Sequence, residues 1–218
     1  MIPIDVLSDP ICPWCYIGKA RLDRARAARP NLALTLHWQP FQLNPDMPRA
    51  GMDRRAYLEA KFGGKEGAAR VYVQIETVAQ AEGLDIDFAA IARTPNTLDA
   101  HRLIRWAEIE GCQDSVVTAL FQRYFRGGQD ISDPAILIET AEEAGMEAAM
   151  VAQLLGTDAD LAEVRAADAR AREMGVSGVP TFLVAHQYVL PGAQETAVWL
   201  RAFDEIESLI AADAAETP

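Results

Sequence analysis

The 218-residue sequence predicts an α/β fold in which a long helical block interrupts a small sheet. Three observations support this: a strand–helix–strand pattern opens the chain, helical patterns without strand patterns fill its middle, and a helix–strand–strand–helix pattern closes it. We therefore expect one discontinuous α/β domain from residues 1–43 and 156–218. Residues 44–155 would form an inserted all-helical domain.

The opening of the chain predicts a βαβ unit. Residues 2–9, IPIDVLSD, alternate apolar and polar side chains as a strand does, and Pro10 ends the pattern. A helix is expected after Cys12, in PWCYIGKARLDRARAARP, until Pro30 ends it. The segment LALTLHWQPF, residues 32–41, is the second expected strand.

The middle and the end of the chain differ in pattern. After the proline-rich connector LNPDMPRAGMD we expect helices from residue 54 to about 155 and no strand, with helix starts at Thr94 and at residues 132–134. The helix DADLAEVRAADARAREMG should end at Gly175, followed by strands in PTFLVA and YVLPG. QETAVWLRAFDEIESLIAA predicts an amphipathic last helix, and AADAAETP a frayed terminus.

Composition narrows the functional classes. Acidic residues outnumber basic ones 32 to 20, for a formal net charge of -12, so we expect no binding to nucleic-acid phosphates or to anionic membrane surfaces. No apolar run approaches the ~20 residues of a membrane span. The opening MIPIDVLSDP lacks the basic and apolar regions of a signal peptide. These features favour a cytoplasmic protein without nucleic-acid or membrane partners.

Cys12 and Cys15, in SDPICPWCYIGKARL, are the main candidates for chemistry. Structural zinc usually needs four ligands from paired motifs, whereas Cys112 is the only other cysteine and the three histidines are scattered. A structural disulfide here would close too small a loop to restrain the unfolded chain much. Since a close cysteine pair in the cytoplasm is more often catalytic or metal-binding, we favour redox chemistry.

The residues around the pair predict how it would react. Proline disfavours helical geometry in the residue before it and suits the first helical position, so Pro13 places Cys12 at the N-cap. The sulfur should face the free N–H groups of the first turn, including that of Cys15, and the positive end of the helix dipole, which stabilise a thiolate. Cys12 would then be the exposed nucleophile and Cys15 the resolving thiol.

Four segments together resemble a known family. DPICPWCYIGKARL, TPNTLDAHRLIRWA, GVSGVPTFLV and VLPGAQ are similar to the thioredoxin superfamily, specifically its DsbA-like branch and the cytoplasmic FrnE-like group. That group is related to the 2-hydroxychromene-2-carboxylate isomerases and kappa-class glutathione transferases. The resemblance covers essentially the whole chain, and it implies a thioredoxin fold with an inserted all-helical domain.

The resemblance also implies roles for particular residues. Pro180 would follow a cis peptide bond and lie against the cysteine pair, leaving the Val179 backbone to hydrogen-bond an extended substrate as an added strand. The isomerase relatives usually carry serine at the nucleophile position. Cys12 stands there instead, which favours thiol–disulfide exchange.

Other residues have two interpretations each. Pro13 and Trp14 would tune the redox pair, and Trp14 either contacts substrate or packs against the insertion. His101 could line the cleft between the lobes, although a histidine on an amphipathic helix is more often structural. Asp9 and Asp5 could relay protons to Cys15 if buried, or one could be solvated and the other cap a turn. Cys112 is expected to be an incidental thiol.

The sequence therefore predicts a thiol–disulfide oxidoreductase, with disulfide isomerisation as a second mode, that needs no bound cofactor. Its partners would be thiol or disulfide proteins and peptides, with glutathione as a candidate co-substrate, and a homodimer is compatible with the sequence. Two alternatives remain open. One is a glutathione-dependent small-molecule isomerase or transferase with an apolar pocket in the helical lobe, and the other is a non-catalytic adaptor.

Overall fold

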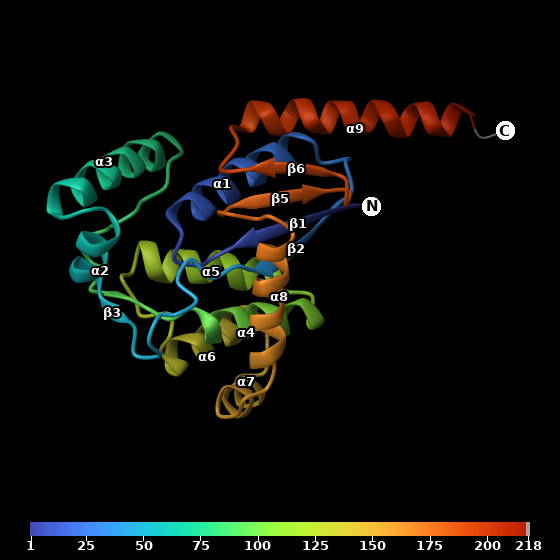
Figure 1. Ribbon diagram of the computed structural model, residues 1–218. Coiled ribbons are helices and arrows are strands. Elements are labelled where there is room, and N and C mark those ends of the chain that lie inside the picture. Colours follow the sequence, from blue (N-terminus) through green and yellow to red (C-terminus); the bar gives the residue numbers. More distant parts are fainter. Residues whose placement is uncertain (217–218) are drawn as a thin grey trace.

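A four-stranded mixed sheet organises the protein (Figure 1), here a computed structural model that describes the backbone of residues 1–216 and the side chains of residues 1–209. The strands are β1 (Ile2–Ser8), β2 (Leu34–Pro40), β3 (Met52–Asp53), β4 (Arg93–Thr94), β5 (Thr181–Val184) and β6 (Tyr188–Pro191). The helices are α1 (Pro13–Ala28), α2 (Arg54–Lys61), α3 (Lys65–Ala81), α4 (Leu98–Ile109), α5 (Gln113–Phe125), α6 (Pro134–Glu143), α7 (Ala148–Leu155), α8 (Leu161–Glu173) and α9 (Thr196–Glu216).

The sheet brings the two ends of the chain together in the order β2-β1-β5-β6. β1 runs parallel to β2, as the α1 crossover requires, and antiparallel to β5, which in turn pairs antiparallel with β6. Ile4 and Val6 of β1 are fully buried. β1 and β5 are the two central strands, and the C-terminal end of β1 lies beside the start of β5. α1 begins at this same end of the sheet.

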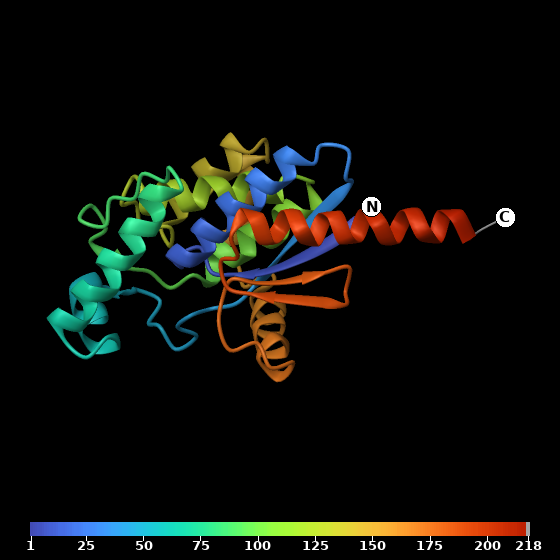
Figure 2. The ribbon, with the colours of Figure 1, turned by 90° about the horizontal axis from the view of Figure 1, so that it is seen from above.

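Helices cover both faces of the sheet (Figure 2): α1 and α9 lie on one side and α8 on the other. Trp199 and Phe203 of α9 are fully buried, and the Trp199 ring meets the Phe182 ring of β5 edge-on at 4.9 Å between centroids. α9 then continues past the edge of the sheet. The discontinuous sheet and its helices confirm the predicted fold class.

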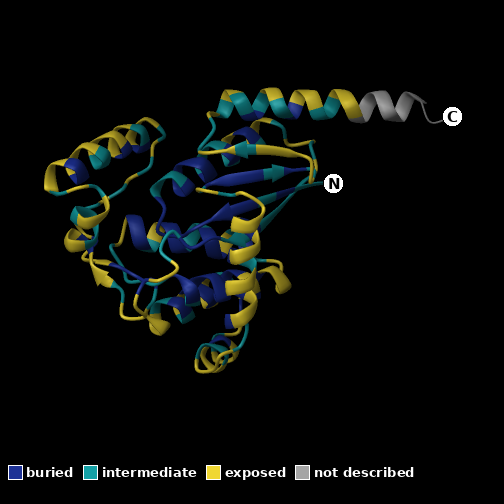
Figure 3. Cartoon of the chain, in the orientation of Figure 1, coloured by how far each residue is buried: buried dark blue, intermediate teal, exposed yellow. Residues whose placement is uncertain are grey.

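The helices between β2 and β5 form two groups. α4 and α5 are largely buried beside β2 (Figure 3), and the rings of Phe121 and Phe125 stack on Tyr16 of α1 at 5.2 and 5.7 Å. α2 and α3 instead stand to one side as a pair of exposed helices, joined to the body through α1 and the short strands.

Several sequence expectations need correction. Met52–Asp53 pairs antiparallel with Arg93–Thr94, so the middle of the chain does contain strands. The expected helix start at Thr94 is wrong because Thr94 belongs to that pair; α4 begins at Leu98, after Thr97. α6 begins at Pro134 with Asp133 as its N-cap, as expected.

The ends of the chain and the domain division can also be compared with expectation. α9 extends to Glu216, beyond the expected helix end, and residues 217–218 of the predicted frayed terminus lie outside the described residues. Within residues 1–216, none of the helices combines the length and apolar character needed to cross a membrane. The exact domain boundaries at residues 43/44 and 155/156 stay predictions.

Candidate active site

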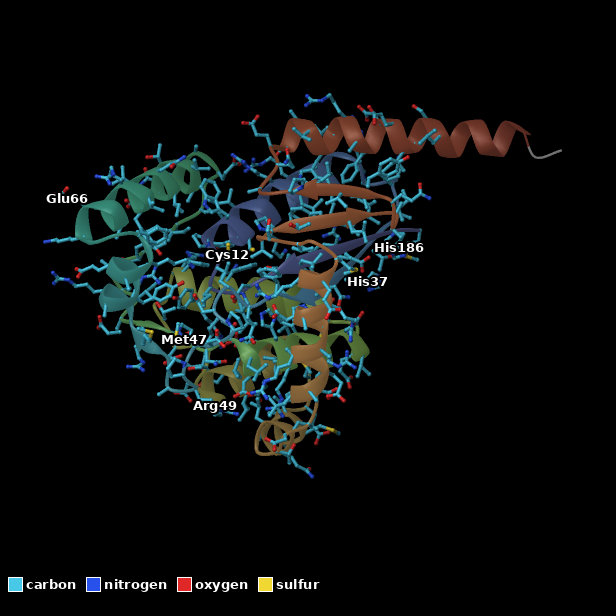
Figure 4. The ribbon with its side chains drawn as sticks, viewed as in Figure 1. Cys12, His37, Met47, Arg49, Glu66 and His186 are labelled. Carbon is cyan, nitrogen blue, oxygen red and sulfur yellow. The ribbon has the colours of Figure 1, made fainter. Side chains whose placement is uncertain are left out.

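The cysteine pair lies where β1 ends and α1 begins. Cys12 is the N-cap of α1, with an extended backbone at φ −87° and ψ 113°, and Pro13 occupies the first helical position. Its N–H donates to the Asp9 carbonyl at 2.9 Å, and its own carbonyl accepts from the Cys15 N–H at 3.0 Å. Figure 4 shows Cys12 at the end of α1 nearest to α2 and α3. The predicted N-cap position of Cys12 is confirmed.

The surroundings of the Cys12 sulfur differ from the expectation in two ways. The sulfur makes no capping hydrogen bond to the first turn of α1; it donates instead to the Val179 carbonyl at 3.6 Å. Cys12 is also only 4% exposed, so the expectation of an exposed nucleophile is wrong. The Val179 carbonyl, contributed from far along the chain, lies against the sulfur, and Cys12 belongs to the main buried core.

Cys15 lies one turn inside α1 and is 1% exposed. Burial raises the pKa of the Cys15 thiol well above its ordinary value, and interaction with Cys12 raises it further. Hydrogen bonds to the Ser8 side chain and to the Asp9 backbone act in the opposite direction. Both thiols are free. Cys15 is therefore a protonated, inner thiol next to the more outward Cys12.

The segment before β5 completes the site. The Val179–Pro180 peptide bond is cis, as the resemblance implies. Pro180 packs so tightly on α1 that a Cβ atom on Gly18 would lie 3.0 Å from the Pro180 Cγ and 3.4 Å from the Phe182 ring. Gly18 thus permits the close approach that brings Val179 against Cys12.

A buried acid and a buried histidine lie behind the cysteine pair. Asp9 is fully buried; its carboxylate accepts from the Leu43 N–H at 2.7 Å and the Ile11 N–H at 3.3 Å, and lies 3.9 Å from His101 Nε2. Burial raises the pKa of Asp9 to about 7 and lowers the pKa of His101 to about 4. Both groups are consequently uncharged in mildly acidic solution.

The structure brings four of the predicted site residues together: Cys12, Cys15, Val179 and Pro180. His101 and Trp14 lie outside this group. His101, on α4, contacts the Asp9 side of this group and is 3% exposed, so it is packed beneath the site and does not line an open cleft. Trp14 is half-buried and packs beside Ile17 and Ile75, which places it against α3 of the insertion.

The two acids of the first strand have separate surroundings. The Asp9 carboxylate accepts the Ile11 N–H two residues on, so it caps a turn. Asp5 pairs with His186 at 3.2 Å. Cys15 is approached by the backbone of Asp9, while the carboxylate is directed to Leu43 and His101. A direct proton relay from the Asp9 carboxylate to Cys15 therefore gains no support.

Sequence reasoning missed two residues that shape the site. Ser8 is among the groups that lower the pKa of Cys15 against the effect of burial, and Gly18 allows Pro180 to approach. Gly18 stands three residues after Cys15, one helical turn on, so it shares the face of α1 that carries the inner thiol. That spacing was an available signal, whereas Ser8 offered none.

Fold and site together define a thioredoxin-fold protein: a Cys-x-x-Cys pair at the start of the first helix, opposite a cis-proline that precedes a central strand. The family comparison agrees. Residues 3–204 match the family model of the DSBA-like thioredoxin domain. The chain belongs to this family.

Solved structures show the same fold. A probable DsbA oxidoreductase, SCO1869 from Streptomyces coelicolor, is 31% identical, with a TM-score of 0.84 over 94% of this chain and 89% of that one. A 2-hydroxychromene-2-carboxylate isomerase is 17% identical, with a TM-score of 0.69 over 99% of each chain. The cytosolic disulfide reductase DsbM from Pseudomonas aeruginosa, solved with GSH, is 17% identical, with a TM-score of 0.64 over 98% and 99%.

Proposed function

We propose that this protein is a dithiol–disulfide oxidoreductase that acts through Cys12 and Cys15. The observation that carries the proposal is the position of the Cys12 sulfur, at the N-cap of α1 and against the Val179 carbonyl before cis-Pro180. A helix N-terminus stabilises a thiolate, and the backbone before the proline can hydrogen-bond an extended substrate. Membership of the DSBA-like family supports the same reaction class.

In the proposed reaction the Cys12 thiolate attacks one sulfur of a substrate disulfide. A mixed disulfide forms on Cys12, the substrate S–S bond breaks, and the leaving sulfur departs as a thiolate. Cys15 then attacks the Cys12 sulfur, which releases the second substrate thiol and leaves a Cys12–Cys15 disulfide. Two electrons pass from the dithiol to the substrate, and the reverse sequence oxidises a substrate dithiol.

The raised pKa of Cys15 suits it to the second step. While Cys15 stays protonated it does not compete with Cys12 for the incoming disulfide. Its proton must leave before it attacks the mixed disulfide, and the thiolate released in the first step is a suitable acceptor. No bound cofactor is needed for this sequence.

Partners and compartment follow from the same proposal. We propose thiol or disulfide proteins and peptides as substrates and glutathione as a candidate co-substrate. The structure of DsbM with GSH supports the second choice by analogy of fold. A cytoplasmic location also remains our proposal, in keeping with the description of DsbM as cytosolic.

A glutathione-dependent isomerase is the second candidate, favoured by the fold shared with 2-hydroxychromene-2-carboxylate isomerase and by a cavity between α2 and α3 described below. One variant separates the two. Cys15→Ser should stop dithiol exchange at the mixed disulfide, whereas an isomerase that uses only Cys12 to handle glutathione would keep its turnover. Trapping of a stable Cys12–glutathione adduct in Cys15→Ser, with loss of turnover, supports the oxidoreductase.

A further inference from the structure

A cavity of about 680 Å³ lies between α2 and α3, outside the cysteine site. This volume is within the range of small-molecule binding sites, roughly 300–1,000 Å³. Much of its lining is apolar, from Leu58, Ala68, Tyr72, Phe88 and Ile91. A cavity of this kind suits a ligand with an apolar body.

One buried cation lines this cavity. Arg54 is 7% exposed, and its guanidinium donates to the Tyr124 hydroxyl at 2.8 Å and the Tyr72 hydroxyl at 3.0 Å. The rings of Tyr72, Phe88 and Tyr124 surround it at 5.2 to 5.8 Å from their centroids. Within the described residues, no carboxylate lies within 4.0 Å of Arg54, although buried charges are normally paired.

The other charged groups around the cavity do not supply the missing anion. The neighbouring Arg55 is exposed and pairs with Glu59 at 2.9 Å. Asp53 caps α2 by accepting the Ala56 N–H at 2.9 Å. Lys65 and Glu76, which also line the cavity, carry opposite charges, and neither is paired with Arg54 in the described residues. Arg54 therefore keeps a positive charge inside the cavity.

The Tyr72 hydroxyl adds a second donor. Its oxygen accepts from Arg54, and in the part of the chain that the structure describes its own proton has no acceptor. Tyr124 differs, because its hydroxyl donates to the Arg93 carbonyl at 3.3 Å. An anion beside Arg54 could accept from the guanidinium and from the Tyr72 hydroxyl together, which is the arrangement that a carboxylate's two oxygens require.

We propose that this cavity binds a small organic carboxylate with an apolar body, held by the Arg54 guanidinium and the Tyr72 hydroxyl. The carboxylate supplies the missing counter-charge, and the apolar body occupies the space between α2 and α3. This binding needs neither thiol, so it can be tested independently of the proposed exchange activity.

The cavity is joined to the body of the protein by aromatic packing. Aromatic rings connect the cavity to α1: Tyr72 meets Phe88 at 4.6 Å, Phe88 meets Phe125 at 6.3 Å, and Phe125 stacks on Tyr16 at 5.7 Å between centroids. Aromatic packing therefore links the cavity to the helix that carries the cysteine pair.

The test is a calorimetric titration of the full-length protein with 2-naphthoate and with its neutral analogue 2-naphthamide. We expect saturable 1:1 binding of 2-naphthoate and binding of 2-naphthamide weaker by about ten-fold or more, because a hydrogen bond to a charged group contributes about 1.5–3 kcal/mol. Arg54→Met should abolish this preference for the acid. The matched variant Arg55→Gln, which removes the paired neighbour, should leave it unchanged.

Arg54→Met could unfold the protein because Arg54 is buried, so Tyr72→Phe provides a second test. This variant keeps the ring and removes the hydroxyl donor. It should weaken the binding of 2-naphthoate by about five-fold and leave the binding of 2-naphthamide unaffected. Equal binding of acid and amide to the wild type, no binding of either, or a Tyr72→Phe variant that keeps the full preference would overturn the proposal.

Discussion

Two regions of the molecule, the sheet side around Cys12 and the α2–α3 side around Arg54, are built differently. On the sheet side the Val179 carbonyl accepts from the Cys12 sulfur, and Pro180 packs on Gly18. On the α2–α3 side the cavity is lined by side chains, among them Arg54 and Tyr72. Backbone contacts serve any disulfide, whereas side chains distinguish one ligand from another. Under the two proposals above, the sheet side governs exchange and the α2–α3 side governs selectivity.

The largest effect should come from the cysteines. Cys12→Ser should reduce exchange with every disulfide to the rate without protein, because it removes the attacking sulfur. Cys15→Ser should still react once and then hold the substrate as a mixed disulfide. Incubation with glutathione disulfide, acid quenching and intact mass measurement would show these outcomes. Cys112→Ser is the matched control and should behave as wild type; a loss of exchange there would assign Cys112 a role in the reaction.

The next largest effect should be on the pH dependence of the free energy of unfolding, through Asp9 and His101 behind the cysteine pair. In unfolded chains Asp loses its proton near pH 3.9 and His near 6.5. Folded Asp9 keeps its proton to about pH 7, so its contribution to the free energy of unfolding falls as pH rises from about 4 to 7. Folded His101 stays neutral down to about pH 4, so its contribution falls as pH decreases from 6.5 to 4.

These opposite slopes largely cancel in the wild type between about pH 4 and 6.5, and single variants should reveal them. Relative to wild type, the free energy of unfolding of Asp9→Asn should rise with pH by about 1.4 kcal/mol per unit, and that of His101→Gln should fall by a similar amount. Urea unfolding at several pH values measures both. Curves parallel to the wild type would mean that the two groups titrate normally.

A larger side chain at Gly18 should lower both the free energy of unfolding and the rate of disulfide exchange. Gly18→Val would push side-chain atoms into Pro180 and Phe182, with an expected cost of about 1–3 kcal/mol and slower exchange with all disulfides alike. Gly178→Ala is the stability control, because a Cβ there meets nothing within 4 Å. If Gly18→Val were as stable and as active as wild type, the close approach of Pro180 would not matter.

The smallest effect should be on selectivity. Tyr72→Phe should slow exchange with the aromatic acid disulfide 5,5′-dithiobis(2-nitrobenzoate) by about five-fold, the value of one hydrogen bond. Exchange with the neutral 4,4′-dithiodipyridine should keep its wild-type rate. Stopped-flow absorbance follows both reagents. Equal slowing of the two would show that the α2–α3 side does not distinguish ligands by charge.

Local patterns predicted part of the sheet side, and the family resemblance supplied the rest. The alternation in residues 2–9 and the Cys12–Pro13 step each act within a few residues and lie where they were expected. The cis bond before Pro180 was expected only because of the resemblance. The burial of Cys12 could not be predicted in this way, because the Val179 carbonyl that covers it comes from 167 residues away. Sequence spacing gives no measure of such a contact.

The cavity on the α2–α3 side could not be predicted from the sequence. Arg54 meets Tyr72, Phe88 and Tyr124 only after three separate segments have packed together. The same applies to Asp9, whose pKa depends on burial beneath Leu43 and His101. At Thr94 the following proline suggested a helix start, but pairing with β3 took that residue into a strand.

The most direct test of the proposed exchange is a redox titration. The protein would be equilibrated in graded mixtures of glutathione and glutathione disulfide, quenched in acid and alkylated, and its blocked thiols counted by mass for wild type and Cys12→Ser. We expect a reversible transition of two thiols in the wild type that is lost in Cys12→Ser. A wild type that never forms the Cys12–Cys15 disulfide at any ratio would contradict the oxidoreductase.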